Sequence, residues 1–181
     1  MHQDPAKDLQ RLQADDLQVF QLLQRTGFDH LQLSKYRQLE FWQLQFNQLR
    51  SFRPARNSNR RDIALYHAFD EQGFHFNKPF LAREILWLGE VNGYPLRLLY
   101  NKFPFADFHS LLLIEAEQQK PQFLGAADCS KIQQLQETLT ALTGYGLAYN
   151  SLGAYASVNH QHWQLFLSAA DYPVELAQWT H

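Results

Sequence analysis

The dipeptide Asn92-Gly93 stands between two apolar segments and constrains the fold more than any other feature of the chain. Asparagine followed by glycine adopts the positive φ angles that a two-residue turn requires, so the pair predicts a β-hairpin. Its strands are expected at residues 84–91 and 94–100. Further strands are expected at residues 109–114, near 147–149 and from about 158 to 167, which gives an antiparallel sheet of about five strands.

The segment from residue 130 to residue 142 predicts a helix that packs on this sheet. Ser130 and Gln133 match the capping-box pattern, in which two side chains bond the free backbone groups of a helix start. Apolar residues then recur on one side of the expected helix. They are Ile132, Leu135, Leu139 and Leu142, and Gly144 and Gly146 are expected to end the helix.

Residues 1–50 predict a helical N-terminal segment, because leucine and aromatic residues are interleaved with many glutamines. Asp15-Asp16 can start a helix that ends at Gly27. Residues 34–43 can form another helix, although the aromatic residues there fit neither the helical nor the strand period. The basic stretch 51–62 is expected to be a solvated loop, with a phosphate contact by Arg53, Arg56, Arg60 or Arg61 as the alternative.

The expected strands and covering helix give an α+β fold, and the length suits one domain that spans residues 1–181. Hydrophobic residues make up 45% of the chain, which is enough for a core, and the net charge of −2 gives no sign of a large basic surface for nucleic acid. The lone Cys129 excludes an internal disulfide and a cysteine-cluster zinc site. No signal-peptide pattern and no apolar run near the ~20 residues of a membrane span is present. We therefore expect a soluble cytoplasmic protein that binds neither nucleic acid nor membranes.

The segment from Asn159 to Gln164 carries the candidate chemistry. In a strand, alternation places His160, His162 and Gln164 on one face, where three polar groups would be costly to bury without partners. A neutral imidazole can attack phosphorus when a hydrogen bond holds its other nitrogen. Gln164 and Ser157 can then donate to the phosphoryl oxygens. From the residues alone, a zinc site with a third ligand elsewhere and ordinary structural histidines remain open.

The stretch Gly153-Ala-Tyr-Ala-Ser-Val-Asn-His-Gln-His-Trp-Gln164 resembles the signature of the histidine-triad superfamily, in the transferase branch where glutamine replaces the last histidine. With the preceding residues from Tyr149 it is similar to the GDP-L-galactose and GDP-hexose phosphorylases, which Gly73-Phe-His-Phe-Asn-Lys78 resembles more weakly. Tyr100-Asn-Lys-Phe-Pro104, followed by residues 109–114, resembles the diadenosine tetraphosphate phosphorylases. These motifs define a core at residues 73–167.

The resemblance implies an α+β fold of the histidine-triad type and a role for each matching residue. His162 would be the nucleophile that forms a nucleotidyl-histidine, the main-chain carbonyl of His160 would orient it, and Gln164 would hold phosphoryl oxygens. His109 would support His160 from behind. The positions expected near the substrate are Asn101, His109, Asn150, Gly153 and Ser157, and Gly153 would form a tight turn there.

The function implied is that of a nucleotidyltransferase or phosphorylase that cleaves a nucleoside diphosphate-sugar or a dinucleoside polyphosphate, with phosphate as acceptor. A nucleotide hydrolase and a nucleotide-binding protein without turnover are the alternatives. No cofactor and no metal are expected. Because residues 171–181 supply only a brief tail, a homodimer partner could complete the pocket.

Overall fold

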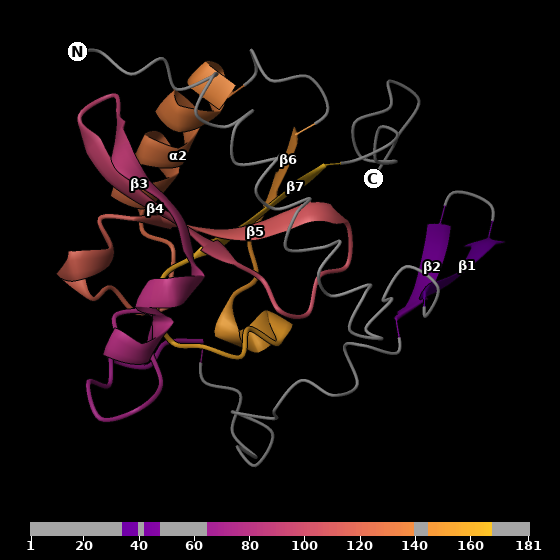
Figure 1. The fold of residues 1–181 in the computed structure, drawn as a ribbon, viewed down its shortest axis with the longest axis horizontal. Helices are drawn as coiled ribbons and strands as arrows, with labels where there is room; N and C mark the ends of the chain where they lie inside the picture. The colour runs from indigo at the N-terminus through magenta and orange to yellow at the C-terminus, as the bar shows by residue number, and fades with distance from the viewer. Residues whose placement is uncertain (1–33, 40–41, 48–64, 140–144, 168–181) are drawn as a thin grey trace.

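The computed structural model describes residues 34–39, 42–47, 65–139 and 145–167. Its centre is a five-stranded antiparallel sheet with the strand order β3-β4-β5-β7-β6 (Figure 1). The strands are β3 (Ile85–Val91), β4 (Tyr94–Tyr100), β5 (Asp107–Ile114), β6 (Tyr145–Ala148) and β7 (Trp163–Leu167). The predicted antiparallel sheet of about five strands is therefore confirmed.

The hairpin between β3 and β4 turns at Asn92-Gly93, as predicted. The φ angles are 53° at Asn92 and 80° at Gly93, so both residues adopt the left-handed region that a two-residue turn needs. Val91 then pairs with Tyr94 at the start of the ladder. The local signal was sufficient here because turn geometry alone sets the register of a short hairpin.

Helix α2 (Ala126–Leu139) begins four residues before the predicted start. The backbone N–H of Gly125 donates to Oδ2 of Asp128 at 3.0 Å, so the Asp128 carboxylate caps a free backbone N–H at the start of the helix. Ser130 lies inside the helix, and its hydroxyl donates to the carbonyl of Ala126. The capping box at Ser130 is therefore wrong, since an earlier acidic residue caps the helix.

The apolar stripe of α2 faces the sheet, as expected at the residues whose side chains are described. Leu135 is fully buried and Ile132 packs against the same cluster. Leu142 and Gly144 lie outside the described residues. Gly146 lies in β6 rather than at the end of the helix. A Cβ there would come within 2.7 Å of the ring of Phe166 on the neighbouring strand, so glycine leaves room for that ring.

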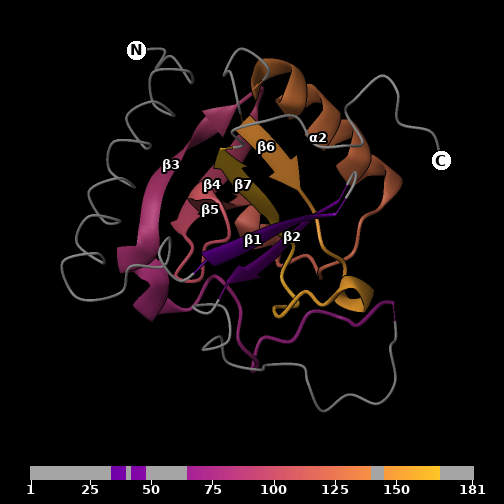
Figure 2. The same cartoon turned by 90° about the vertical axis from the view of Figure 1, so that its right-hand side faces the viewer.

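Residues 34–39 and 42–47 pair as the two antiparallel strands of a β-hairpin, which contradicts the expected helical segment in this part of the chain. Strands β1 (Ser34–Leu39) and β2 (Trp42–Asn47) pair with each other and lie to one side of the large sheet (Figures 1 and 2). The side-chain amides of Gln45 and Asn47 donate to the carbonyls of Phe105 and Pro104 at 2.8 and 2.9 Å. These contacts are between distant parts of the chain, so a local pattern does not show them. The expected helix at 15–27 and the basic stretch 51–62 lie outside the described residues.

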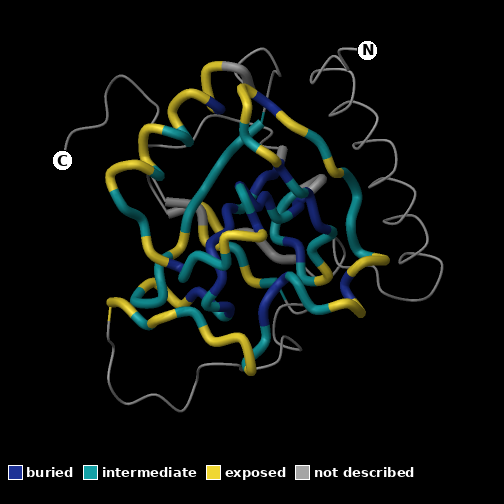
Figure 3. The backbone as a smooth tube through the Cα atoms, turned by 90° about the vertical axis from the view of Figure 1, so that its left-hand side faces the viewer, coloured by how far each residue is buried: buried dark blue, intermediate teal, exposed yellow. Residues whose placement is uncertain are grey.

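Strand alternation divides the core between the two faces of the sheet. On one face, α2 covers Leu98, Leu112 and Leu165. On the other face, Leu99 and Leu113 pack against Phe76 of the segment that precedes β3. Figure 3 shows the buried backbone gathered at the centre of the molecule, with the coils of α2 largely exposed. No helix among the described residues is long and apolar enough to cross a membrane.

Three short 3-10 helices complete the described elements. They are η2 (Pro79–Glu84), η3 (Ala116–Gln118) and η4 (Leu152–Ala154). Strand β7 begins only at Trp163, so residues 158–162 precede the strand instead of forming its first half. The chain there runs beside the loop 120–123, and the backbone N–H of Gln161 donates to the carbonyl of Lys120 at 2.8 Å.

Candidate active site

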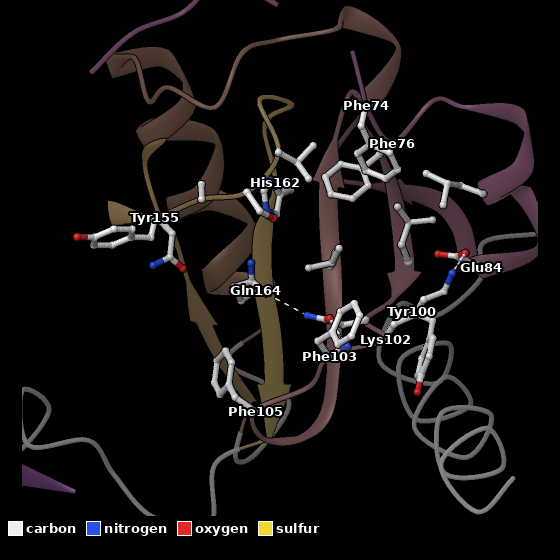
Figure 4. Close-up of a pocket in the computed structure, with 18 of the residues that line it drawn as sticks. Phe74, Phe76, Glu84, Tyr100, Lys102, Phe103, Phe105, Tyr155, His162 and Gln164 are labelled. Carbon is white, nitrogen blue, oxygen red and sulfur yellow. Dashed lines mark hydrogen bonds and ion pairs between the residues drawn. The ribbon is translucent and has the colours of Figure 1, made fainter. Parts of the chain in front are cut away.

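A pocket of about 300 Å³ lies on the sheet face that carries Leu99 and Leu111 (Figure 4). Much of its wall is aromatic, from Phe74, Phe76, Phe80, Tyr100, Phe103, Phe105 and Tyr155. Its polar wall comes from Glu84, Asn101, Lys102, Asn150, Ser157, His162 and Gln164. Small-molecule sites combine apolar walls with a few placed polar groups, so this pocket is the candidate site. Five of the eight predicted site residues line it, and the other three (His109, Gly153 and His160) do not.

The imidazole of His162 is oriented by the main chain of His160. Its Nδ1 donates to the carbonyl oxygen of His160 at 2.7 Å, so the ring lone pair belongs to Nε2. The ring of Phe76 packs against it edge to face, with 5.0 Å between ring centres. His162 is therefore an imidazole held in a fixed orientation at the wall of the pocket.

The buried side chain of Gln122 holds the backbone of His162 in place. Oε1 of Gln122 accepts from the N–H of His162 at 2.8 Å, and Nε2 donates to the carbonyl of His162 at 3.0 Å. The same amide nitrogen donates to the carbonyl of Asn150 at 2.8 Å. The Gln122 side chain thus makes the hydrogen bonds to the backbone of His162 that neighbouring strands make to the backbone of β7. Sequence reasoning missed Gln122, because nothing distinguishes it from the other glutamines of a glutamine-rich chain.

The side chain of His160 points away from the pocket and both ring nitrogens bond to backbone groups. Nδ1 accepts from the N–H of Phe76 at 3.1 Å, and Nε2 donates to the carbonyl of Ala116 at 3.0 Å. Burial lowers the pKa of His160 to about 4, against the raising effect of the Ala116 carbonyl. His160 is therefore neutral at pH 7 and joins the segment 74–77 to η3.

The expected place of His109 behind His160 is wrong, because other groups occupy both ring nitrogens of His160. His109 instead supports Gln164. Its Nδ1 accepts from the N–H of Phe105 at 3.1 Å, which leaves the proton on Nε2 for donation to Oε1 of Gln164 at 2.5 Å. Both residues lie on the pocket face, on the paired strands β5 and β7.

Asn101 reaches the same amide from the end of β4. Its Nδ2 is 3.4 Å from Oε1 of Gln164 and 3.0 Å from Nε2 of His109. Because Nε2 of His109 carries a proton, it cannot accept a hydrogen bond from Asn101. Nδ2 of Asn101 therefore donates to Oε1 of Gln164. With two donors at its carbonyl oxygen, Gln164 presents its NH₂ group as a donor on the side of His162 (Figure 4).

The loop 150–158 closes the pocket beside His162. Asn150 and Ser157 line the pocket, as predicted. Gly153 lies inside η4 and does not line it. The left-handed residue of the loop is Tyr155, with a φ of 64° and a side chain that is 90% exposed. Gly153 is thus the central residue of a tight 3-10 turn, as expected, and Tyr155 ends that turn in the left-handed conformation. Among the described residues, no group of three or more His, Cys, Asp or Glu could hold a metal ion.

Comparison with known proteins assigns the chain to a family. A similar protein is GDP-D-glucose phosphorylase 1 of Danio rerio, with 34% identity over 103 residues, which are 55% of this chain and 29% of the relative. The crystal structure of yeast Ap4A phosphorylase Apa2 in complex with Ap4A shares the fold, with a TM-score of 0.54 and 18% identity over 95% of this chain and 54% of that chain. The chain thus covers about half the length of Apa2 and less than a third of the length of GDP-D-glucose phosphorylase 1. The family model described as GDPGP1-like, N-terminal domain, matches residues 38–166, so the chain belongs to this family.

Proposed function

We propose that this chain transfers a nucleotidyl group from a nucleoside diphosphate-sugar to inorganic phosphate, through a covalent intermediate on His162. The observation that carries the proposal is the pairing of an oriented imidazole with a donor amide in one pocket. Nδ1 of His162 is bonded to the His160 carbonyl, and the NH₂ group of Gln164 lies on the same side of the pocket. Family membership and the phosphorylase named among the relatives support the same reaction class.

In the first step, the Nε2 lone pair of His162 attacks the α-phosphorus. The P–N bond forms as the P–O bond to the β-phosphate breaks, and the sugar phosphate leaves with that electron pair. The Nδ1 proton stays on the ring, where the carbonyl of His160 stabilises the positive charge. In the second step, a phosphate oxygen attacks the same phosphorus, the P–N bond breaks, and the nucleoside diphosphate is released with neutral His162 restored.

Gln164 stabilises the phosphoryl oxygens during both steps. Charge builds on these oxygens as the attacking atom approaches, and a donor already in place stabilises it without reorganisation. His109 and Asn101 hold the carbonyl of Gln164, so the amide cannot turn its oxygen toward the phosphate. A glutamine that rotated freely would present its acceptor half of the time.

The test is to incubate the full chain with GDP-D-glucose, with and without phosphate. We expect an acid-labile, base-stable nucleotidyl adduct on His162 without phosphate, and phosphate-dependent release of GDP when phosphate is added. Release of GMP into water instead would identify a hydrolase, and binding without an adduct would identify a binding protein. Ap4A serves as the second substrate in the same assay.

The matched control is His162→Ala, which should form no adduct and retain the fold. Full transfer by a folded His162→Ala variant would falsify the mechanism. Circular dichroism and a denaturation curve show whether the variant is folded.

A further inference from the structure

Glu84 places a carboxylate in the aromatic part of the pocket. It is the last residue of η2, and its side chain is only 14% exposed. Oε1 is buried, and the ammonium group of Lys102 lies against it as an ion pair. Figure 4 shows Glu84 well apart from His162, with the rings of Phe74 and Phe76 between them.

A carboxylate in such surroundings is costly for the free protein. Phe80 and Leu81 of the same short helix η2 also line the pocket, and burying an ionised group beside apolar side chains without full hydrogen bonding is unfavourable. The ion pair with Lys102 offsets this cost only in part, because the Lys102 side chain is 53% exposed and water weakens the attraction. A ligand that donates to Glu84 would supply further hydrogen bonds to the carboxylate.

The ligand fitted by this end of the pocket is a flat aromatic group with hydrogen-bond donors on its edge. If the α-phosphate is at His162, as the proposed function requires, the nucleobase extends toward the aromatic end. The relatives leave the base open, since one is named for a guanine nucleotide and the other is complexed with an adenine nucleotide. The residues of this chain can decide between them.

We infer that Glu84 and Lys102 select guanine, with the Glu84 carboxylate accepting from N1–H and the 2-amino group and the Lys102 ammonium donating to O6. An ionised carboxylate only accepts and an ammonium group only donates, so the pair matches the edge of guanine, which has one acceptor followed by two donors. Adenine presents a donor amine beside an N1 lone pair. It would place that lone pair against the carboxylate and its amine against the ammonium group.

The experiment measures equilibrium binding of GDP, IDP and ADP to the full chain by calorimetry. IDP lacks only the 2-amino group of GDP, so it isolates the second bond to Glu84. We expect affinity to fall from GDP to IDP to ADP, with GDP favoured over ADP by roughly 10–100-fold, the size of a hydrogen bond to a charged group. Equal affinity for GDP and ADP would overturn the inference.

Two substitutions separate recognition from a structural ion pair. Glu84→Gln should remove most of the preference for GDP over ADP, because an amide offers one acceptor and can donate to adenine N1. Lys102→Met should weaken GDP and IDP together and keep their ratio, since both bases carry O6. Glu90→Gln, at an exposed position of β3, is the matched control and should change nothing. If Glu84→Gln weakened the binding of all three nucleotides equally, the role of Glu84 would be structural only. That result would overturn the inference.

The proposed nucleotidyl transfer and the proposed preference for guanine can be refuted independently of each other. Selective binding of GDP without an adduct on His162 would refute nucleotidyl transfer and keep the base assignment. An adduct formed equally from guanine and adenine nucleotides would refute the base assignment and keep the mechanism. If Glu84→Gln does not fold, the ratios measured with the native chain and with Lys102→Met still decide the question.

Discussion

The Nε2 atom of His109 lies 2.5 Å from the side-chain oxygen of Gln164 and donates its proton to it. The direction of this bond follows from Phe105, whose backbone N–H occupies the other ring nitrogen of His109. His109 is therefore a positioning residue for Gln164. The bond determines which half of the amide faces a phosphate in the pocket.

Replacing Gln164 should slow transfer strongly, and replacing His109 should do so through Gln164. Gln164→Ala is expected to lower kcat by roughly 10²–10³-fold, the effect of losing one oxyanion donor. His109→Leu should lower kcat less, because the amide is still present but no longer held. In the double variant, the His109 substitution should add almost nothing, and kcat measured for all four proteins checks this. Fully additive effects would contradict the positioning role.

Gln122→Glu should destabilise the protein and impair catalysis together. The substitution keeps the acceptor for the N–H of His162 but turns two donations, to the carbonyls of Asn150 and His162, into repulsive contacts. With about 1 kcal/mol for each lost bond and more for the repulsion, the free energy of unfolding should fall by about 2–4 kcal/mol. Urea denaturation and kcat measure the two effects. Gln118→Glu, at an exposed position of η3, is the control and should alter neither.

Stability should fall with acid below about pH 6.5 because of His160. Burial holds its pKa at about 4 in the folded protein, compared with the ordinary value of 6.5. The unfolded chain therefore binds a proton between these pH values that the folded protein does not, and the free energy of unfolding decreases as the pH is lowered through this range. The loss attributable to His160 approaches about 3 kcal/mol near pH 4.

His160→Gln is the comparison for this pH dependence. An amide can accept from the N–H of Phe76 and donate to the carbonyl of Ala116, but it does not titrate. Denaturation curves between pH 4.5 and 7.5 should show a shallower acid loss for this variant. An identical pH dependence in both proteins would show that His160 is not the group responsible.

Leu135→Ala should lower the free energy of unfolding by about 2–5 kcal/mol, since the side chain is fully buried between α2 and the sheet. Leu88→Ala, at a position of β3 that is 60% exposed, should change it by no more than about 0.5 kcal/mol. Urea denaturation measures both. Similar losses in the two variants would show that the contact of α2 with the sheet is not the source of the effect.

The parts of the fold that local rules determine were predictable from sequence. The turn at Asn92-Gly93 depends on φ angles that few residue pairs adopt, so the hairpin of β3 and β4 followed directly. The hairpin of β1 and β2 was not predictable in this way. Its contacts with the chain at Pro104 and Phe105 join residues that are 57 and 60 positions apart, and they override an ambiguous local pattern.

The pocket residues of the motif were predictable, but their supports were not. His162 and Gln164 line the pocket, as strand alternation and the motif predicted, even though β7 starts only after His162. The alternation of side chains does not show where a strand stops pairing with the next strand. At His162, which precedes β7, the Gln122 side chain makes the backbone hydrogen bonds instead. The partner of His109 was misplaced for a similar reason: a residue's match to a motif does not determine which of two nearby side chains its ring will contact.

The absence of a side chain at Gly146 has a consequence for variation within the family. The ring of Phe166 occupies the space that a Cβ would take, and it packs against Phe105 and His109, with ring centres 5.0 and 6.0 Å away. A larger residue at 146 would displace the ring that supports His109, and with it the orientation of Gln164. Positions 146, 166 and 109 should therefore covary among relatives that retain the glutamine, although Gly146 itself does not line the pocket.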